Sequence, residues 1–506
     1  MPTGIPKRGL AAVALTLAAA VGMSACSGSD ASAGPENVLT VAADNFLMSL
    51  EAHKHSSEGA VLGPMQHVLE PLVTRNSEDP TQIEPLLASS WYNPDPLTWE
   101  FEIQEDATFS NGDPVTAEDA KSSLEAIIDS GGGIAPLLEP INGIEADGKT
   151  LTVTTAQQLG TLLNSLTMAL IAPADGMAED DFWLEPYGSG PFVIESFLPD
   201  SELALRRNEA YWSDAPAYDE LVYKSIPEES ARLTALSNGE IDVITGISAD
   251  AADEVAAFEN VTYNSYPSYG YQMVWFNSSR EPFTDERVRR AMWHALDIET
   301  IVNDLYGDEG IVGRAPIPQT VFGAPEFDQY EYDPELAQEL LADAGFPDGF
   351  DTSMQWSDAS GTGDHALAQT MISYWAEIGV AVEPAPKERA IWSEDLVNLD
   401  FDMNIQGNAV ATGDADYTLG RLYLCEANRN GYCNPELDEL LLEAKAELDP
   451  AKREAFYEEA SRIIWDEAVG IFPLDGTGAV AYRDRVQDYL PDPGGRHSFA
   501  SATLSD

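Results

Sequence analysis

The chain has 506 residues, 44 % of them hydrophobic and 9 % aromatic, so it can build packed cores and is too long for a single one. Its 87 acidic and 26 basic residues give a formal net charge of −61, which argues against nucleic acid as a partner, because a phosphate backbone would be repelled. The acidity fits solubility in a salty medium, where counterions screen repulsion over about 3–10 Å, with attraction of cationic ligands as the alternative.

The first residues have the pattern of an export signal. Lys7 and Arg8 precede an apolar run over residues 10–21, which is too short for a good transmembrane span, and small residues then lead to Cys26. Small residues directly before a cysteine are similar to the bacterial lipobox, in which the cysteine becomes the lipidated first residue. We therefore expect a globular body held outside the membrane by lipid, with a plain signal peptide and a chance cysteine as the alternative.

The first half of the body alternates short apolar runs with turns. Residues 97–103 (LTWEFEI) alternate at period two, which predicts a half-buried strand. The sequence TAED opens a predicted helix over 116–128 with a capping-box-like start, and the glycines at 131–133 end it. Residues 151–154 are another strand candidate.

Helical signals strengthen in the second half. From Val288, apolar residues recur at i, i+3, i+4, i+7 and i+8, which is one face of a helix. Asp-Pro pairs at 333 and 449 predict two more helix starts, and Gly345 ends the first of them. The remaining predictions are a helix face over 437–444 and strands at 470–472 and 478–481. Mixed strands and helices throughout predict an α/β fold.

Two cysteines remain in the body, Cys425 and Cys433, in the run LCEANRNGYC. Export permits a disulfide, and the intervening Asn-Arg-Asn-Gly has turn chemistry that can bring the two together. A zinc site is the alternative, but two cysteines with no nearby histidine make poor ligands. We therefore predict a disulfide, worth roughly 2–3 kcal/mol in the chain-entropy model.

Catalytic and metal-binding patterns are sparse. With six histidines, the chain has no His-Glu-x-x-His pair, no Gly-x-Ser-x-Gly elbow and no phosphate loop. His53 and His55 are the one local cluster; at strand spacing they would share a face and could bind a soft cation, with a solvated loop as the alternative. We predict no catalytic residue, no metal and no cofactor, and keep an exported hydrolase as the distant alternative.

Several motifs, in order along essentially the whole mature chain, point to one family. They are PLLASSW at 85–91 with the strand, turn and helix of 97–128, YGSGPF at 187–192, RNEAYW at 207–212, LSNGEID at 236–242, WFNSSREPFTDERVRRAMWHALD at 275–297, YDPEL at 332–336 and AGFP at 344–347. Each motif alone is weakly specific, and their number and order carry the resemblance. The chain resembles the solute-binding proteins of ABC importers in the peptide/nickel group (family 5), which includes oligopeptide- and dipeptide-binding lipoproteins.

The resemblance implies an α/β Venus-flytrap of the periplasmic-binding-protein kind (type II, cluster C), with two lobes, a hinge of two crossing segments and a small extra subdomain in the first lobe. Ligand between the lobes favours the closed form by contacting both, and a transporter would read that closure as a population shift. The crossings are expected at about 275–277 and 472–475. The expected boundaries are a signal peptide over 1–25, a tether over 26–37, a first lobe over 38–274 and 476–506, and a second lobe over 275–475.

The same resemblance gives a role to Asp414 and Asp416 in the glycine-flanked loop 407–420. In peptide-binding relatives an aspartate of the corresponding loop pairs with the ligand's α-ammonium; Asp414 is the first candidate and Asp416 the second, with a solvated loop as the alternative. No arginine occupies the loop 357–364, where dipeptide-binding relatives offer one to the ligand's carboxylate, and Arg389 is a candidate replacement. Aromatic residues are expected to form the walls: Tyr269, Trp275, Trp356, Trp392 and Tyr417.

The export pattern and the resemblance together imply a lipid-anchored receptor on the outer face of the cytoplasmic membrane. We expect a monomer that captures oligopeptides and delivers them to the membrane subunits of an ABC permease. A non-peptide solute, such as a nickel or other metal chelate, an oligosaccharide or a small amine, is the alternative within the same fold.

Overall fold

The computed structural model describes four stretches of the chain: residues 37–44, 48–54, 59–359 and 362–505. The expected signal peptide, the lipobox residue Cys26 and His55 lie outside these stretches. In the part of the chain that is described, every helix is too short or too polar to cross a membrane.

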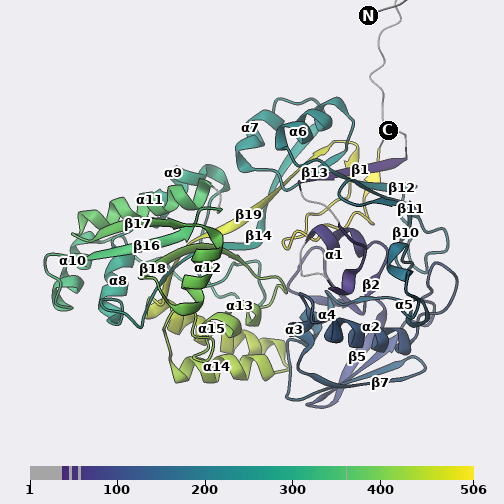
Figure 1. Ribbon diagram of the computed structural model, residues 1–506, viewed down its shortest axis with the longest axis horizontal. Helices are drawn as coiled ribbons and strands as arrows, with labels where there is room; N and C mark the ends of the chain where they lie inside the picture. Colours follow the sequence, from purple (N-terminus) through teal and green to yellow (C-terminus); the bar gives the residue numbers. More distant parts are fainter. Residues whose placement is uncertain (1–36, 45–47, 55–58, 360–361, 506) are drawn as a thin grey trace, which may run out of the picture. The chain divides into compact units, whose positions relative to one another are not determined.

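A mixed sheet of eleven strands passes through both halves of the chain (Figure 1). In sheet order its strands are β10 (Phe192–Leu198), β11 (Glu202–Arg207), β12 (Glu220–Ser225), β1 (Val38–Ala43), β13 (Val243–Thr245), β19 (Gly470–Arg483), β14 (Val261–Phe276), β18 (Met403–Ala409), β16 (Asp351–Ser357) and β17 (Ala381–Lys387), and β15 (Ile311–Val312) pairs with β19 outside that order. The strands β12, β1 and β13 are parallel, as are β17, β16 and β18.

The two longest strands, β14 and β19, pair antiparallel along almost their whole length. The strands predicted at 470–472 and 478–481 are therefore the two ends of a single strand, because β14 covers the same edge of β19 at both ends. The pairing shifts register between Pro267 and Tyr271 and again between Gln272 and Val274.

A separate four-stranded sheet has the order β5 (Ala88–Asp95), β6 (Thr98–Ile103), β8 (Thr150–Thr155) and β7 (Ile141–Asp147). Half-buried and buried residues alternate along β6 and β8, so the two strands predicted at 97–103 and 151–154 are confirmed. The helix α2 (Ala117–Ser130) packs on β7 and β8 (Figure 1). The other described strand pairs are short: β2 (Glu70–Pro71) with β9 (Leu170–Ile171), β3 (Val73–Arg75) with β4 (Ile83–Pro85), and β20 (Val486–Gln487) with β21 (Thr503–Leu504).

Helix ends follow the predicted capping signals. The Thr116 hydroxyl accepts from the Asp119 N–H while the Asp119 carboxylate accepts from the Thr116 N–H, and Gly131 ends α2 with a φ of 60°. Asp297 caps a second helix directly after the predicted one around Val288. The remaining α-helices are α1 (Gly59–Met65), α3 (Ala135–Leu138), α4 (Leu162–Leu166), α5 (Ala174–Met177), α6 (Glu229–Asn238), α7 (Ala252–Val255), α8 (Glu286–His294), α9 (Ile298–Tyr306), α10 (Pro334–Asp343), α11 (Thr362–Glu377), α12 (Arg389–Asn398), α13 (Asp416–Tyr423), α14 (Pro435–Ala446) and α15 (Pro450–Asp466).

Buried side chains form two large cores. The first is drawn from residues 39–243 with additions from 480–502, and the second from residues 269–474. A third, smaller cluster packs α6 and α7 against the strands β13 and β19. Two cores joined by shared long strands, with an additional sheet on the first core, give the α/β fold with two lobes and an extra subdomain that the resemblance implied. The first core is called the first lobe below, and the second core the second lobe.

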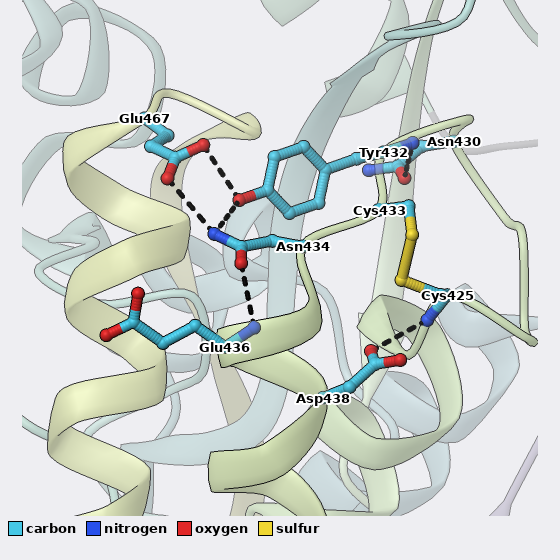
Figure 2. Close-up of a disulfide and its surroundings, with 8 residues drawn as sticks. All are labelled: Cys425, Asn430, Tyr432, Cys433, Asn434, Glu436, Asp438 and Glu467. Atoms are coloured by element: carbon cyan, nitrogen blue, oxygen red, sulfur yellow. Dashed lines mark hydrogen bonds between the residues drawn. A yellow bond between two sulfur atoms is a disulfide. The ribbon is translucent and has the colours of Figure 1, made fainter.

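Cys425 and Cys433 are joined by a disulfide in the second lobe (Figure 2). The bridge closes the turn between α13 and α14, and Asp438 on α14 accepts a hydrogen bond from the backbone N–H of Cys425 at 2.9 Å. Beside it, the Tyr432 hydroxyl donates to Glu467, just after α15, at 2.8 Å. The turn therefore joins the ends of three helices.

Candidate functional site

The glycine-flanked loop that follows β18 holds Asp414 in the protein interior. Its side chain is 1 % exposed, and Nη2 of Arg453 donates to both carboxylate oxygens, at 2.8 and 2.7 Å. The Tyr457 hydroxyl donates to the same carboxylate at 3.2 Å. Arg453 and Tyr457 both lie on α15, so their contacts with Asp414 join the loop to that helix. Asp414 already has a cationic partner within the protein, and its predicted contact with a ligand's ammonium gains no support from this arrangement.

Asp416, the second predicted anchor, begins α13 at the wall of a small cavity. Lys445 lies 3.7 Å from its Oδ2, and Oδ1 is buried without a hydrogen bond from any described residue. Burial raises the pKa of Asp416 to about 6, although the charge of Lys445 acts in the opposite direction. The cavity, of about 70 Å³, is also lined by Tyr417 and by Leu159 and Thr161 of the first lobe. A space of this size holds about two water molecules.

Two predicted aromatic residues also lie at this loop. The ring of Tyr417 is half-buried, and the Arg421 guanidinium lies 4.8 Å from its centre. Tyr269 is 1 % exposed and packs against Gly413, where a Cβ would come within 2.7 Å of its hydroxyl oxygen. Gly413 has a φ of +65°, which also favours glycine. The guanidinium of Arg75 lies 5.2 Å from the centre of the Tyr269 ring. Four predicted residues therefore meet here.

The other predicted residues lie elsewhere in the second lobe. Trp275 and Trp356 are each 2 % exposed inside its core, so they are packing residues rather than walls of a cleft, because burying such large rings stabilises the fold. Trp392 is half-buried on α12, and its Nε1 donates to Asn404 at 2.7 Å. Arg389 is exposed at the start of the same helix.

His53 packs inside the first lobe. Its Nε2 lies 2.8 Å from the carbonyl oxygen of Leu170, its ring meets Trp183 edge-on, and burial lowers its pKa. Within the described stretches, no group of three or more His, Cys, Asp or Glu residues is arranged to hold a metal ion.

A larger cavity, of about 400 Å³, opens at the carboxyl ends of the parallel strands β12, β1 and β13. Open α/β sheets bind ligands at this edge. None of the lining residues was among the predicted ones. The cavity is formed by the ends of strands that are neighbours in the sheet, and the order of strands in a sheet is not apparent from local sequence. The residues that line the cavity include the segments 245–247 and 477–479, the aromatic residues Tyr223, Tyr266 and Phe499, and the charged residues Asp44 and Lys224.

One edge of β19 has no described strand beside it for part of its length, where it faces this cavity. β14 covers the opposite edge. On the cavity side, β13 stops opposite Val480, and β15 begins only opposite Asp475. No described strand covers residues 476–479 between these two points, so this edge can pair with another extended chain.

A two-lobed α/β fold with a crevice at the ends of parallel strands is the fold of the periplasmic binding proteins. The particular family follows from the sequence match: the chain belongs to the bacterial extracellular solute-binding proteins, family 5, whose middle region matches residues 82–430. Members of this family are extracytoplasmic substrate-binding proteins of ABC importers, and they are not enzymes. This protein is therefore a substrate-binding protein of the same class.

The names of two relatives refer to different solutes. Heme-binding protein A of Haemophilus influenzae is 27 % identical over 463 residues, 84 % of this chain and 84 % of that protein. The probable D,D-dipeptide-binding periplasmic protein DdpA of Escherichia coli is 27 % identical over 492 residues, 93 % of this chain and 95 % of that protein. The structure of HbpA2 from Haemophilus parasuis has a TM-score of 0.86 at 22 % identity, covering 93 % of this chain and 100 % of that chain. The family therefore establishes a solute receptor without naming the solute.

Proposed function

We propose that the protein captures oligopeptides between its lobes and passes them to the membrane subunits of an ABC permease. The uncovered edge of β19 carries this proposal. A peptide has N–H and C=O groups at strand spacing, so it can pair with residues 476–479 as an added strand. Pairing through the backbone is largely independent of peptide sequence, which suits a receptor that feeds on mixed peptides.

The size of the cavity supports the same proposal, and its walls come from the first lobe and from the strands β14 and β19 that join the lobes. Its volume of about 400 Å³ lies within the range of small-ligand pockets. The printed name of the Escherichia coli relative also refers to a dipeptide ligand. We place the two crossings between the lobes near Pro267–Tyr271 and 475–477, rather than at 275–277, because Trp275 packs inside the second lobe and the register of β14 shifts between Pro267 and Tyr271.

The export pattern completes the proposal. A lipid on Cys26 holds the monomeric receptor on the outer face of the cytoplasmic membrane, and residues 26–37 act as its tether. Metabolic labelling with a palmitate analogue tests this point: the wild type is expected to incorporate the label and the Cys26→Ser variant to lose it. Equal labelling of the two proteins would overturn the lipid anchor.

The peptide itself is tested in two steps. Native mass spectrometry of the purified lipid-free protein is expected to release a ladder of peptides of mixed sequence. Thr477→Trp fills the cavity beside the uncovered edge and is expected to weaken binding of tetra-alanine at least tenfold, whereas Thr262→Trp, on an exposed part of β14, leaves it unchanged. Release of one metal complex, heme or sugar would sink the peptide proposal.

A further inference from the structure

A second cavity lies beside the same C-terminal segment, residues 495–499. Gly495, His497 and Phe499 line the cavity described above, whereas Arg496 and Ser498 line another, of about 310 Å³. The two cavities are therefore neighbours with different walls.

Two buried arginines line this second cavity. The side chain of Arg75 is 5 % exposed, and Arg496 is 9 % exposed. Burial, and after it the nearby charge of Arg75, lowers the pKa of Arg496 to about 10. Two like charges that are brought together out of water are costly unless an anion accompanies them.

The guanidinium of Arg75 is only partly hydrogen-bonded within the described residues. Its Nη2 donates to the carbonyl oxygen of Ala411, in the second lobe, at 3.1 Å. Its Nε and Nη1 are buried and donate no hydrogen bond to any described residue. The carboxylate of Asp492 lies 3.9 Å from Nη1, beyond hydrogen-bonding distance, and also accepts from the backbone N–H of Arg496 at 3.0 Å. Two donors of Arg75 are thus without a hydrogen bond among the described residues.

Glu70, the other acidic residue that lines the cavity, already accepts two hydrogen bonds from neighbouring side chains. Glu70 accepts from the Tyr211 hydroxyl at 2.6 Å and from Nε1 of Trp212 at 2.9 Å. Burial raises its pKa, although these hydrogen bonds act against the shift. Of the two carboxylates that line the cavity, Asp492 is therefore the one near the guanidinium of Arg75, at 3.9 Å from Nη1.

We propose that this cavity binds an oxyanion, a carboxylate or a phosphate group, between the guanidinium groups of Arg75 and Arg496. The planar fork of an arginine matches the oxygens of such groups and forms charge-assisted hydrogen bonds with them. Because Arg75 also contacts Ala411, the anion lies beside a contact between the two lobes. The proposal does not depend on which solute occupies the first cavity.

Titration calorimetry with sodium phosphate and with sodium citrate, at constant ionic strength, tests the site in the purified protein. At least one of the two anions is expected to bind at one site per chain and to bind at least tenfold more weakly to Arg75→Met. The control Arg290→Met removes an arginine that is 44 % exposed on α8 and should leave binding unchanged. If Arg75→Met does not fold, Arg75→Lys keeps the charge without the fork and should bind several-fold more weakly.

Tetra-alanine and its C-terminal amide distinguish a free anion from the carboxylate of the captured solute. If the site receives the solute's carboxylate, the amide binds at least tenfold more weakly than the acid to the wild type but not to Arg75→Met. If it binds a free anion, acid and amide bind alike and phosphate does not compete with them. Absence of any Arg75-dependent binding of phosphate, citrate or the free acid would overturn the site. Failure of both peptides alone would count against the peptide function and leave the phosphate and citrate results intact.

Discussion

Arg453 and Arg75 are equally buried, each with a side chain that is 5 % exposed, but they differ in how many of their donors form hydrogen bonds within the protein. Arg453 donates to both oxygens of Asp414, at 2.8 and 2.7 Å, and lies 3.0 Å from the Tyr457 hydroxyl. Arg75 has its ion-pair partner at 3.9 Å and leaves two nitrogens without a hydrogen bond among the described residues.

Burial alone therefore does not say what a charged residue does. A buried ion with a close partner holds two elements together, and removal of either partner leaves an uncompensated charge. A buried ion with unused donors gains instead from any ligand that supplies the missing acceptor. The same contrast separates Asp414 from Asp475, which accepts from the Gln319 backbone N–H at 3.2 Å and forms no ion pair within the described residues.

The largest expected effect is the loss of the buried pair. Asp414→Asn leaves Arg453 buried without a carboxylate and is expected to lower the free energy of unfolding by about 3–5 kcal/mol, measured by urea denaturation. Asp400→Asn breaks an ion pair with Arg280 in which the Asp400 side chain is 69 % exposed, and should cost about 1 kcal/mol or less. Equal losses would contradict a structural role for Asp414. Weaker ligand binding at unchanged stability would restore the predicted anchor.

The disulfide ranks next. Replacing both Cys425 and Cys433 with serine removes a bridge between residues eight positions apart. The double variant is expected to lose about 2–3 kcal/mol in the free energy of unfolding, because the bridge restricts the unfolded chain. Reduction of the wild type by dithiothreitol should shift its urea midpoint to that of the double variant, whose own midpoint should not respond. An effect below about 1 kcal/mol would show that the hydrogen bonds of Tyr432 and Asp438 hold the turn without the bridge.

The carboxyl of Asp475, which forms no ion pair among the described residues, should make stability depend on pH. Burial raises its pKa from 3.8 to about 7, so between these values the folded protein binds more protons than the unfolded chain. Stability therefore falls as pH rises through this window, with a slope of up to about 1.4 kcal/mol per pH unit. Asp416 contributes with the same sign, because its pKa is raised to about 6.

The difference between the wild type and Asp475→Asn isolates the contribution of Asp475. Thermal unfolding between pH 4 and 7 is expected to show a flatter profile for this variant. The control Asp484→Asn, at an exposed residue just after the same strand, should keep the wild-type slope. Parallel profiles for all three proteins would show that Asp475 is charged throughout the window.

The smallest expected change in stability is that of Arg75→Met, and comparing it with Arg453→Met tests the difference between the two arginines directly. Arg75→Met is expected to change the free energy of unfolding by no more than about 1 kcal/mol in phosphate-free buffer, because an apolar side chain replaces a poorly paired buried charge. Arg453→Met should cost about 3–5 kcal/mol, since it orphans Asp414. The measurement is urea denaturation of both variants, and a similar cost for the two would mean that Arg75 also has a structural partner.

Local patterns in the sequence were sufficient for many elements. The alternation at 97–103, the capping box of Thr116 and Asp119 and the Asp-Pro helix starts concern neighbours within about four residues, where backbone geometry alone sets the spacing. The order of family motifs likewise indicated the two-lobed fold. The disulfide was predictable for the same reason, because only a short turn separates its cysteines.

The charge partnerships were decided by the tertiary structure. Asp414 lies 39 residues from Arg453, and Arg75 lies 336 residues from Ala411, so no local pattern could place either pair together. In a chain with 87 acidic residues, every loop also offers carboxylates, and sequence cannot tell a solvated one from a buried one. The sequence determined the elements, the fold and the class of receptor. Which charges found partners, and which were left for a ligand, depended on how distant elements pack, because the free energy of a buried charge is set by the few ångströms around it.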